Sequence, residues 1–535
     1  MEADEAARGD HPRWYGALAG AIAAAIALVF GQLVASFNDD IPGLVLGMGE
    51  WILDITPGDV ATESIDTLGS GGKSALLPGI AITALVIGAV LGDLSKRVSS
   101  HIGTAGFVVF GLLGGFTGAR NPQSPAVASW VWAAVAAALG IATLHFLLAR
   151  MHRPTRLASF REDPRQKSAT RRAFLSWSAG AGAVAVTGYG IASRVGGQSA
   201  AEVARDGLDF SELSSTTTAA PLADAAPLAA PVTPGSFDTV PGIASFVTPN
   251  DTFYRIDTAL SVPQVDPDSW SLSFTGMVDD PYRLTFDEIL AMPELDEHTV
   301  TLSCVSNEVG GGLVGTATWL GVPLRSLLDR AGVHDGASQI VGRSVDDWTA
   351  GFPLSALDDD RTAILAVGMN GEPLPIIHGF PARLVVAGLY GYVSATKWIE
   401  EINLTTWDAF DGYWISRGWS KEGPIKTMSR IDVPRHRDSI TAGATTVAGV
   451  AWSPPRGIRA VELSIDDGEW RECEIAAPGS DETWVQWKTD WSAEAGDHVL
   501  RVRAVDGDGE LQPVGPARVD PDGAEGWHAI QVGVS

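Results

Sequence analysis

Four long apolar segments within residues 1–150 constrain this 535-residue chain more than any other feature. Each segment is long enough to cross the ~30 Å hydrocarbon core of a bilayer as an α-helix. We expect membrane-spanning helices at Trp14–Phe37, Ala75–Leu94, Ile102–Gly118 and Ala126–Leu148. The sequence therefore predicts an all-α transmembrane region over residues 1–150, which excludes a wholly soluble protein.

Two more apolar stretches lie beside these four. Ile41–Ile55 is interrupted by carboxylates and flanked by prolines, which favours an interfacial or re-entrant segment over the alternative of another span. Phe174–Ser193 follows an arginine-rich stretch over residues 150–172, and the positive-inside rule places that stretch in the cytoplasm. The N-terminus then lies inside, and all residues after this fifth span lie outside the cytoplasm.

The arginine-rich stretch also contains a candidate export signal. Arg171-Arg172 is followed by Phe174-Leu175 and a soft, Ala/Gly-rich apolar run, an arrangement similar to an internal twin-arginine signal. The alternative is that the two arginines are ordinary anchors at the cytoplasmic face. We predict a basic segment with a twin-arginine-like fifth span over residues 151–200. The protein is then a multi-pass cell-membrane protein with its catalytic domain on the extracytoplasmic side.

Charge divides the chain near the same place. Residues 1–200 carry a net charge of +1 and residues 201–535 carry −28, which gives the −27 of the whole chain. A nucleic-acid-binding protein needs a basic face for the phosphates. The acidic region therefore weighs strongly against a nucleic-acid partner.

Composition divides the acidic region into three segments. Residues 201–235 become rich in Ala, Pro, Ser and Thr, which predicts an extended linker. Residues 236–430 mix strand-like with helix-like runs, with Thr285 as a predicted N-cap and a helix over Val322–Ala331 that stops at Gly332. Residues 431–535 consist of short strand-like runs between turns, which predicts a β-sandwich. The fold class is therefore α+β with a β-sandwich, after an all-α membrane region.

The chain has two cysteines, Cys304 and Cys473, too few for a disulfide framework, a zinc ribbon or an iron–sulfur site. Cys304 follows a strand-like run and precedes polar residues and the glycines Gly310–Gly312. A lone cysteine is most often a small buried hydrophobe, which is how we interpret Cys473. At a strand end followed by polar residues and glycines, however, the sulfur of Cys304 is expected to face a hollow lined by backbone.

Four stretches resemble, in the same order, the sulfite oxidase family of molybdopterin enzymes. Leu302–Asn307 matches the family pattern Leu-x-Cys-x-x-Asn, and Thr248–Arg255 is similar to its N-terminal pterin-contact segment. Met369–Arg383 resembles the core "MNGxPLP…HGFPxR", and Gly391–Trp398 matches "G…S.KW". The resemblance covers about residue 237 to the C-terminus. It implies a sulfite-oxidase-like molybdopterin-binding catalytic domain over residues 236–430 and an immunoglobulin-like dimerisation domain over residues 431–535.

The resemblance implies a Mo-molybdopterin cofactor with Cys304 as the metal ligand. The cofactor-binding residues that it implies are Asn250, Phe253, Tyr254, Arg255, Asn307, Asp346, His378, Arg383, Ser394 and Lys397. A pterin phosphate needs fixed cations and amide donors, and cations are scarce in a region of this acidity. The cations within family motifs are therefore the strongest candidates.

Three positions depart from the sulfite enzymes of the family. Glu308 and Ile376 (or Ile377) stand where those enzymes have arginines, and Trp348 stands where they have a tyrosine. A carboxylate at short range opposes binding of a doubly charged anion. With Cys304, Glu308 and Trp348 as the substrate-side residues, we expect two-electron oxo transfer on a small S- or N-oxide. The alternatives are a sulfite oxidase or dehydrogenase and a catalytically inactive membrane-anchored module.

The electron partner is not encoded by an obvious motif. The chain has no c-type haem attachment sequence, so a separate electron carrier or a quinone is implied. His101 and His145 lie near the cytoplasmic ends of two predicted spans, where two histidines could hold a b-type haem. Packed or interfacial histidines are commoner, so we do not expect haem b. The resemblance of the C-terminal region to the family's dimerisation domain implies a homodimer through that region.

Overall fold

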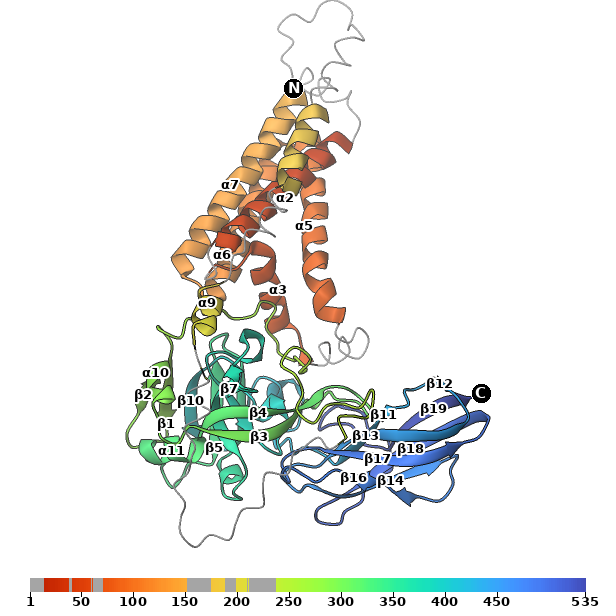
Figure 1. Cartoon of the computed structure of the whole chain (residues 1–535). Coiled ribbons are helices and arrows are strands. Elements are labelled where there is room, and N and C mark those ends of the chain that lie inside the picture. The colour runs from red at the N-terminus through yellow and green to blue at the C-terminus, as the bar shows by residue number, and fades with distance from the viewer. Residues whose placement is uncertain are drawn as a thin grey trace, which may run out of the picture. The chain divides into compact units, whose positions relative to one another are not determined.

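A computed structural model describes most of the chain. The described residues are 14–37, 41–58, 60, 71–151, 175–187, 199–208, 210 and 237–535. They form two compact units, the first Met1–Ser199 with Ala259–Ser261 and the second Ala200–Thr258 with Val262–Ser535. Figure 1 shows the helices of the first unit in red to orange and the strands of the second in green to blue.

The first unit is helical. Its elements are α2 (Trp14–Phe37), α3 (Leu44–Ile55), α5 (Gly71–Arg97), α6 (Ser100–Arg120) and α7 (Ala126–Met151). Among the described residues, four of these helices are long and apolar enough to cross a membrane, and they contain the four predicted spans. The remaining helix, α3, has 12 residues. At about 1.5 Å per residue it is too short to span a bilayer, which agrees with an interfacial or re-entrant segment.

The fifth apolar run is described only in part. Residues 175–187 are helical, whereas Arg171-Arg172 and residues 188–193 lie outside the described residues. The twin-arginine signal and the sidedness of the membrane region therefore stay predictions. Of the two histidines considered for haem, His145 has a polar partner within the bundle, since its Nε2 lies 2.8 Å from Oγ1 of Thr104.

Helices α2 and α5 approach closely where both carry glycine. A Cβ on Gly20 would lie 2.0 Å from the carbonyl oxygen of Gly88, and one on Gly92 would lie 2.2 Å from that of Gly16. Both helices thus place two glycines four residues apart at the contact. In lipid such small residues allow the van der Waals packing that drives helix association.

The second unit begins with two five-stranded sheets. The first has the order β2-β1-β10-β5-β6 and the second has β3-β4-β7-β8 with β9 on β7. The first sheet consists of β1 (Ser271–Gly276), β2 (Tyr282–Thr285), β5 (Gln339–Ser344), β6 (Thr349–Pro353) and β10 (Ile399–Thr405). The second consists of β3 (Asp296–Ser303), β4 (Val314–Pro323), β7 (Ala363–Met369), β8 (Glu372–Pro373) and β9 (Arg383–Val386). Strands β1 and β10 are parallel, and the other pairs within these sheets are antiparallel.

Short helices precede or connect these strands. They are α9 (Ala200–Asp206), α10 (Phe286–Leu290), α11 (Leu324–Ala331), α12 (Gly391–Ser394) and the 3-10 turns η2 (Leu354–Leu357), η3 (Ile376–His378) and η4 (Ile415–Arg417). Thr285 caps α10 in a reciprocal capping box with Glu288, as the sequence predicted. Helix α11 ends at Gly332 in the left-handed conformation, with φ of 68°, as also predicted.

The C-terminal part contains two further sheets. Their orders are β11-β13-β17-β16 and β12-β19-β18-β14-β15. The strands are β11 (Met428–Val433), β12 (Ser439–Ile440), β13 (Gly443–Trp452), β14 (Ile458–Ile465), β15 (Arg471–Glu472), β16 (Glu474–Ile475), β17 (Val485–Ala493), β18 (Gly496–Asp506) and β19 (His528–Val534). One buried cluster joins both sheets and includes Val447 and Trp487 from the first and Val461 and Val502 from the second. This is the sandwich that the sequence predicts, while an immunoglobulin-like strand order stays a prediction.

Candidate functional site

Cys304 lies directly after β3, at the end of its pairing with β4. Its backbone N–H donates to the carbonyl of Leu313 at 2.9 Å, and its Sγ lies 3.4 Å from the backbone N of Ser306. The side chain is buried, 8% exposed. Burial raises the pKa of the thiol, and the Ser306 N–H and the charge of Lys397 oppose that rise. The thiolate that ligates metals thus needs a nearby cation, which a bound metal supplies.

The loop after Cys304 contains an unsatisfied amide. Asn307 Oδ1 accepts from the backbone N–H of Leu313 at 2.8 Å, whereas its Nδ2 is buried without a partner in the described part of the chain. A buried N–H without an acceptor is costly, so an acceptor on a bound group at this place would stabilise the loop. Glu308, next in the chain, is exposed.

The turn from Pro373 to His378 has every carbonyl oxygen engaged by a hydrogen bond. The donors are Arg205 for Pro373 and Leu374, His378 N for Pro375, Trp398 Nε1 for Ile376, Lys397 for Ile377 and Arg383 for His378. Three of these donors are cationic side chains, and charge-assisted hydrogen bonds are the stronger kind. The backbone that carries His378 is therefore fixed along its whole length.

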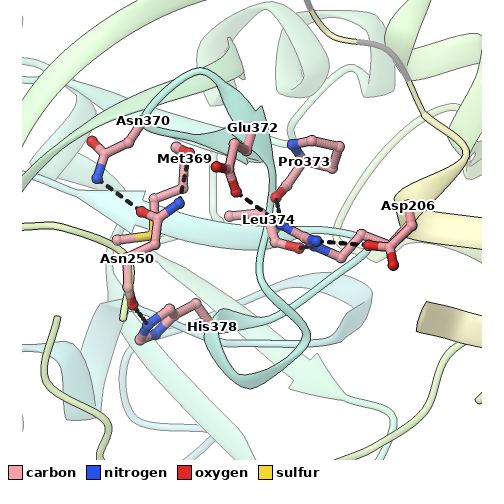
Figure 2. A network of polar contacts seen from close by, with 9 residues as sticks. Asp206, Asn250, Met369, Asn370, Glu372, Pro373, Leu374 and His378 are labelled. Atoms are coloured by element: carbon pink, nitrogen blue, oxygen red, sulfur yellow. Dashed lines mark hydrogen bonds and ion pairs between the residues drawn. The ribbon is translucent and has the colours of Figure 1, made fainter. Parts of the chain in front are cut away.

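His378 is 1% exposed and belongs to this fixed turn. Its Nε2 lies 3.0 Å from the carbonyl oxygen of Asn250, and its ring packs edge-on against Phe253 at 5.5 Å. A carbonyl can only accept, so Nε2 donates. Burial lowers the pKa of His378 to about 4, and the imidazole is neutral at pH 7. Asn250 itself accepts from Nδ2 of Asn370 at 2.8 Å, and Figure 2 shows it between Asn370 and His378.

Arg383 is a buried cation at the start of β9. It is 5% exposed, donates to the carbonyls of His378 and Leu384, and lies 5.0 Å from the ring centre of Trp319. Within the described ranges no carboxylate forms an ion pair with it. Burial lowers its pKa to about 10, so the guanidinium stays charged at pH 7. A buried, uncompensated guanidinium fits an anionic group such as a phosphate.

Asp257 is a site residue that the sequence reasoning missed. Its Oδ2 accepts from Nζ of Lys397 and from Nε of Arg255, both at 2.8 Å. Asp257 and Lys397 are nearly buried, with side chains 8% and 10% exposed. Burial lowers the pKa of Lys397 to about 8, and Asp257 opposes that fall. One carboxylate thus compensates two of the predicted cofactor cations.

The remaining predicted residues lie around this group. Tyr254 stacks on Phe253 at 5.2 Å, and burial raises its pKa, with the charge of Cys304 acting in the same direction. Ser394 is buried and donates to the carbonyl of Tyr390 at 3.1 Å within its own short helix.

Asp346 and Trp348 share the turn between β5 and β6, where Trp348 N lies 3.2 Å from an Asp346 carboxylate oxygen. Burial raises the pKa of Asp346, and the charge of Asp257 adds to this rise. The backbone N–H of Val345 donates to the carbonyl of Trp398 at 3.0 Å. This bond joins the turn to the segment that carries Lys397. Ile377, at 37% exposed, gives the region an apolar rim.

Together these residues fit the predicted cofactor. In the described ranges no three His, Cys, Asp or Glu side chains cluster to hold a metal, so the predicted ligand Cys304 has no further side chains of these types grouped with it. That suits a metal whose other ligands belong to a cofactor. The uncompensated Arg383 and the orphaned Nδ2 of Asn307 supply the cation and donor that a pterin with a phosphate requires.

The family comparison identifies this class of domain. Residues 259–414 match the family model described as "Oxidoreductase molybdopterin binding domain". The fold, the site and this match define a molybdopterin-binding oxidoreductase domain, and the predicted Mo-molybdopterin cofactor is confirmed at this level.

Curated relatives of this chain include sulfite oxidases. The chain is 28% identical over 343 residues to mitochondrial sulfite oxidase of Homo sapiens, which covers 54% of this chain and 62% of that protein. It is 31% identical over 323 residues to mitochondrial sulfite oxidase of Drosophila melanogaster, covering 50% and 55%. The chain thus spans about three-fifths of the length of the first relatives that it matches. Over this domain the chain is therefore similar to the sulfite oxidase family.

One solved structure also aligns with the chain. It is the sulfane dehydrogenase SoxCD from Paracoccus pantotrophus, at 23% identity and a TM-score of 0.46 over 54% of this chain and 81% of that one.

Proposed function

We propose that this protein is a membrane-anchored molybdenum oxidoreductase that transfers an oxygen atom to or from a small neutral S- or N-oxide type of substrate. In the reducing direction, one S-oxide, two electrons and two protons give one sulfide and one water. The bound molybdenum cofactor supplies this two-electron oxo-transfer chemistry. The catalytic unit is proposed to lie outside the cytoplasm, with a separate electron carrier or a quinone as the partner.

The chain's own residues bind and orient the cofactor in this proposal. Cys304 ligates the metal as a thiolate, and Asn307 donates its free N–H to the cofactor. Arg383 and Lys397 hold the anionic phosphate. Neutral His378 keeps its Nδ1 as an acceptor, because Nε2 donates to Asn250.

The observation that carries the substrate class is the pairing of Asp257 with both Lys397 and Arg255. With its charge compensated by this carboxylate, Arg255 is not free to bind a doubly charged substrate anion. Glu308 and the aliphatic Ile376 (or Ile377) also lack a positive charge, at positions where the sulfite enzymes are expected to have arginine. Like charge opposes an anion at short range, whereas a neutral oxide pays no such penalty.

The alternative substrate is sulfite, because curated relatives of this chain include proteins named sulfite oxidase. A substrate screen separates the two. Detergent-purified, cofactor-loaded protein is assayed with a reduced dye on neutral S-oxides and N-oxides, and with an oxidised dye on sulfite. We expect turnover of a neutral oxide and a sulfite kcat/KM at least about 100-fold lower, the scale of one lost charged contact. A sulfite kcat/KM equal to or above that for every oxide overturns the proposed substrate.

A charge variant tests whether the pairing of Asp257 with Arg255 sets the substrate class. Asp257→Asn frees Arg255, so the KM for sulfite should fall while the KM for the neutral oxide changes little. Asp359→Asn is the matched control, since Asp359 pairs Arg361 elsewhere on the same unit. If neither the dye nor any substrate changes the redox state of the loaded cofactor, the inactive-module alternative replaces this proposal.

A further inference from the structure

Helix α9 contributes a side chain to the scaffold of the cofactor site, although it lies outside the segment that matches the family model. Arg205 donates from Nε to the carbonyl of Leu374 at 2.9 Å and from Nη2 to that of Pro373 at 3.0 Å. The same Nη2 lies 3.2 Å from a Glu372 carboxylate oxygen. These acceptors lie together beside Asp206 (Figure 2).

The segment around Arg205 is seated by apolar contacts as well. Ala201 is 1% exposed and Phe210 is 3% exposed. The Phe210 ring lies against β7 at Gly368, where a Cβ would come within 3.0 Å of it. Gly368 pairs with Pro373 in the β7–β8 hairpin. The two anchors, Arg205 and Phe210, therefore hold the same hairpin.

Both sides of this hairpin lead to His378. On one side, Pro373 and Leu374 are the first residues of the turn whose carbonyls are all engaged, and His378 N closes that turn on Pro375 at 2.8 Å. On the other side, Asn370 donates to Asn250, whose carbonyl accepts from His378 Nε2 (Figure 2). A displacement of the hairpin would therefore move both backbone supports of His378.

Arg205 is suited to this task by its chemistry. Its side chain is 19% exposed, and the planar guanidinium reaches two successive carbonyls at once. The carboxylate of Glu372 is 62% exposed, so that ion pair adds little. The interaction that matters is the charge-assisted bonding to backbone, which stabilises one conformation of residues 373–378.

We propose that Arg205 is a positioning residue for the cofactor site, so that α9 and Phe210, at the start of the predicted linker, contribute to that site. The segment is then more than a tether, because seating or releasing α9 alters how firmly the cofactor is held. This inference rests on the proposed cofactor-binding role of the His378 turn.

The test compares cofactor retention in full-length, cofactor-loaded protein. Arg205→Gln removes the charged fork, and Phe210→Ala loosens the same segment without touching the carbonyls. Arg325→Gln is the matched control, because Arg325 also bonds a carbonyl, that of Leu357, and a neighbouring carboxylate, Asp358, at a distant turn. His378→Ala is the reference for the site itself. Pterin retained after repeated dilution and gel filtration is measured, with the pterin circular dichroism signal and limited proteolysis at residues 199–210.

We expect Arg205→Gln to speed cofactor loss about tenfold, within the 10- to 100-fold range seen for outer-sphere partners of metal ligands. Arg205→Lys should recover part of the effect, and Arg325→Gln should behave as the unaltered protein. Phe210→Ala should also speed cofactor loss, and it tests the positioning role if Arg205→Gln does not fold. If proteolysis shows that α9 is released while retention and the pterin signal stay unchanged, the positioning role is refuted. Unchanged retention in His378→Ala would instead refute the proposed site.

Discussion

Each of the two units of this protein is stabilised internally by a different kind of contact. In the membrane unit, α2 and α5 meet where side chains are missing, at glycines whose neighbours lie within 2.0–2.2 Å of an added Cβ. In the catalytic unit, the site is held by long charged side chains that reach backbone carbonyls and one buried carboxylate. Lipid offers no hydrophobic drive between helices, so close packing dominates there. In the catalytic unit, buried carbonyl oxygens need hydrogen-bond donors, so hydrogen bonds from long polar side chains dominate there.

The comparison is tested most sharply at Cys304, whose thiol is proposed to bind the metal and not only to fill space in the core. Cys304→Ser should lower turnover by more than about 100-fold, because removing a direct ligand exceeds the cost of removing an outer-sphere partner. The unfolding midpoint should stay nearly unchanged, since the replacement is similar in size. Cys473→Ser is the control: it is 6% exposed in the sandwich core and should leave turnover intact. Retained turnover in Cys304→Ser would exclude Cys304 as the metal ligand.

The glycine contact gives the second largest effect, and it is confined to the membrane unit. Gly88→Leu should push α5 away from α2, because an added Cβ would lie 2.7 Å from Ala24 Cβ and 2.8 Å from Gly20 O. Overpacking of this kind costs about 1–3 kcal/mol. Gly79→Leu on the same helix is the matched control, since a Cβ there meets nothing within 4 Å.

Thermal unfolding in detergent measures the difference between these two variants. We expect the Gly88→Leu variant to unfold at lower temperature with its cofactor retention unaltered. A parallel loss of cofactor would mean that the two units are not independent in the way that their interactions suggest.

The sequence predicted the features that depend on local patterns and missed those that depend on contacts between distant parts of the chain. Spans, the Thr285 cap and the stop at Gly332 are local patterns, and the structure has them. Arg205 was missed because it bonds Leu374, 169 positions away, and Asp257 because its buried partner Lys397 lies 140 positions away. In a region of net charge −28, one more carboxylate such as Asp257 could not be recognised as a site residue from the sequence. The cations of the family motifs stood out because that background is acidic, but their carboxylate partner did not.

Titration of Lys397 should have a smaller effect, on cofactor affinity, and it concerns the catalytic unit alone. Its pKa is lowered by burial to about 8, so in the cofactor-free protein its charge is present below pH 8 and is lost as the pH rises through this value. Affinity for the anionic cofactor should then fall by up to about tenfold per pH unit above pH 8. Lys397→Arg keeps its charge and should remove this step. Binding measured from pH 6.5 to 9.5 checks it, and an identical pH profile in both proteins would contradict it.

The smallest effect tests glycine in the catalytic unit, where it serves a turn rather than a helix contact. Gly310, in the loop after Cys304, has a φ of 78°, and a Cβ there would lie 2.3 Å from the ring of His528 at the start of β19. Nearby, Arg430 of β11 donates to the carbonyl of Gly311 at 2.8 Å. A residue of the sandwich therefore stabilises the loop after Cys304. Gly310→Ala should therefore destabilise the unit by about 1–2 kcal/mol, from a clash and from left-handed strain.

A double-mutant cycle with His528→Ala separates these two causes. His528→Ala removes the ring that an alanine at 310 would meet, so the combined variant should recover the steric part and keep a residual cost of about 1 kcal/mol for the positive φ. Denaturant unfolding of the four proteins measures the coupling. Strict additivity would mean that the loop moves away from His528 freely. In that case glycine would be required at position 310 for its backbone conformation alone, in contrast to the contact glycines of α2 and α5.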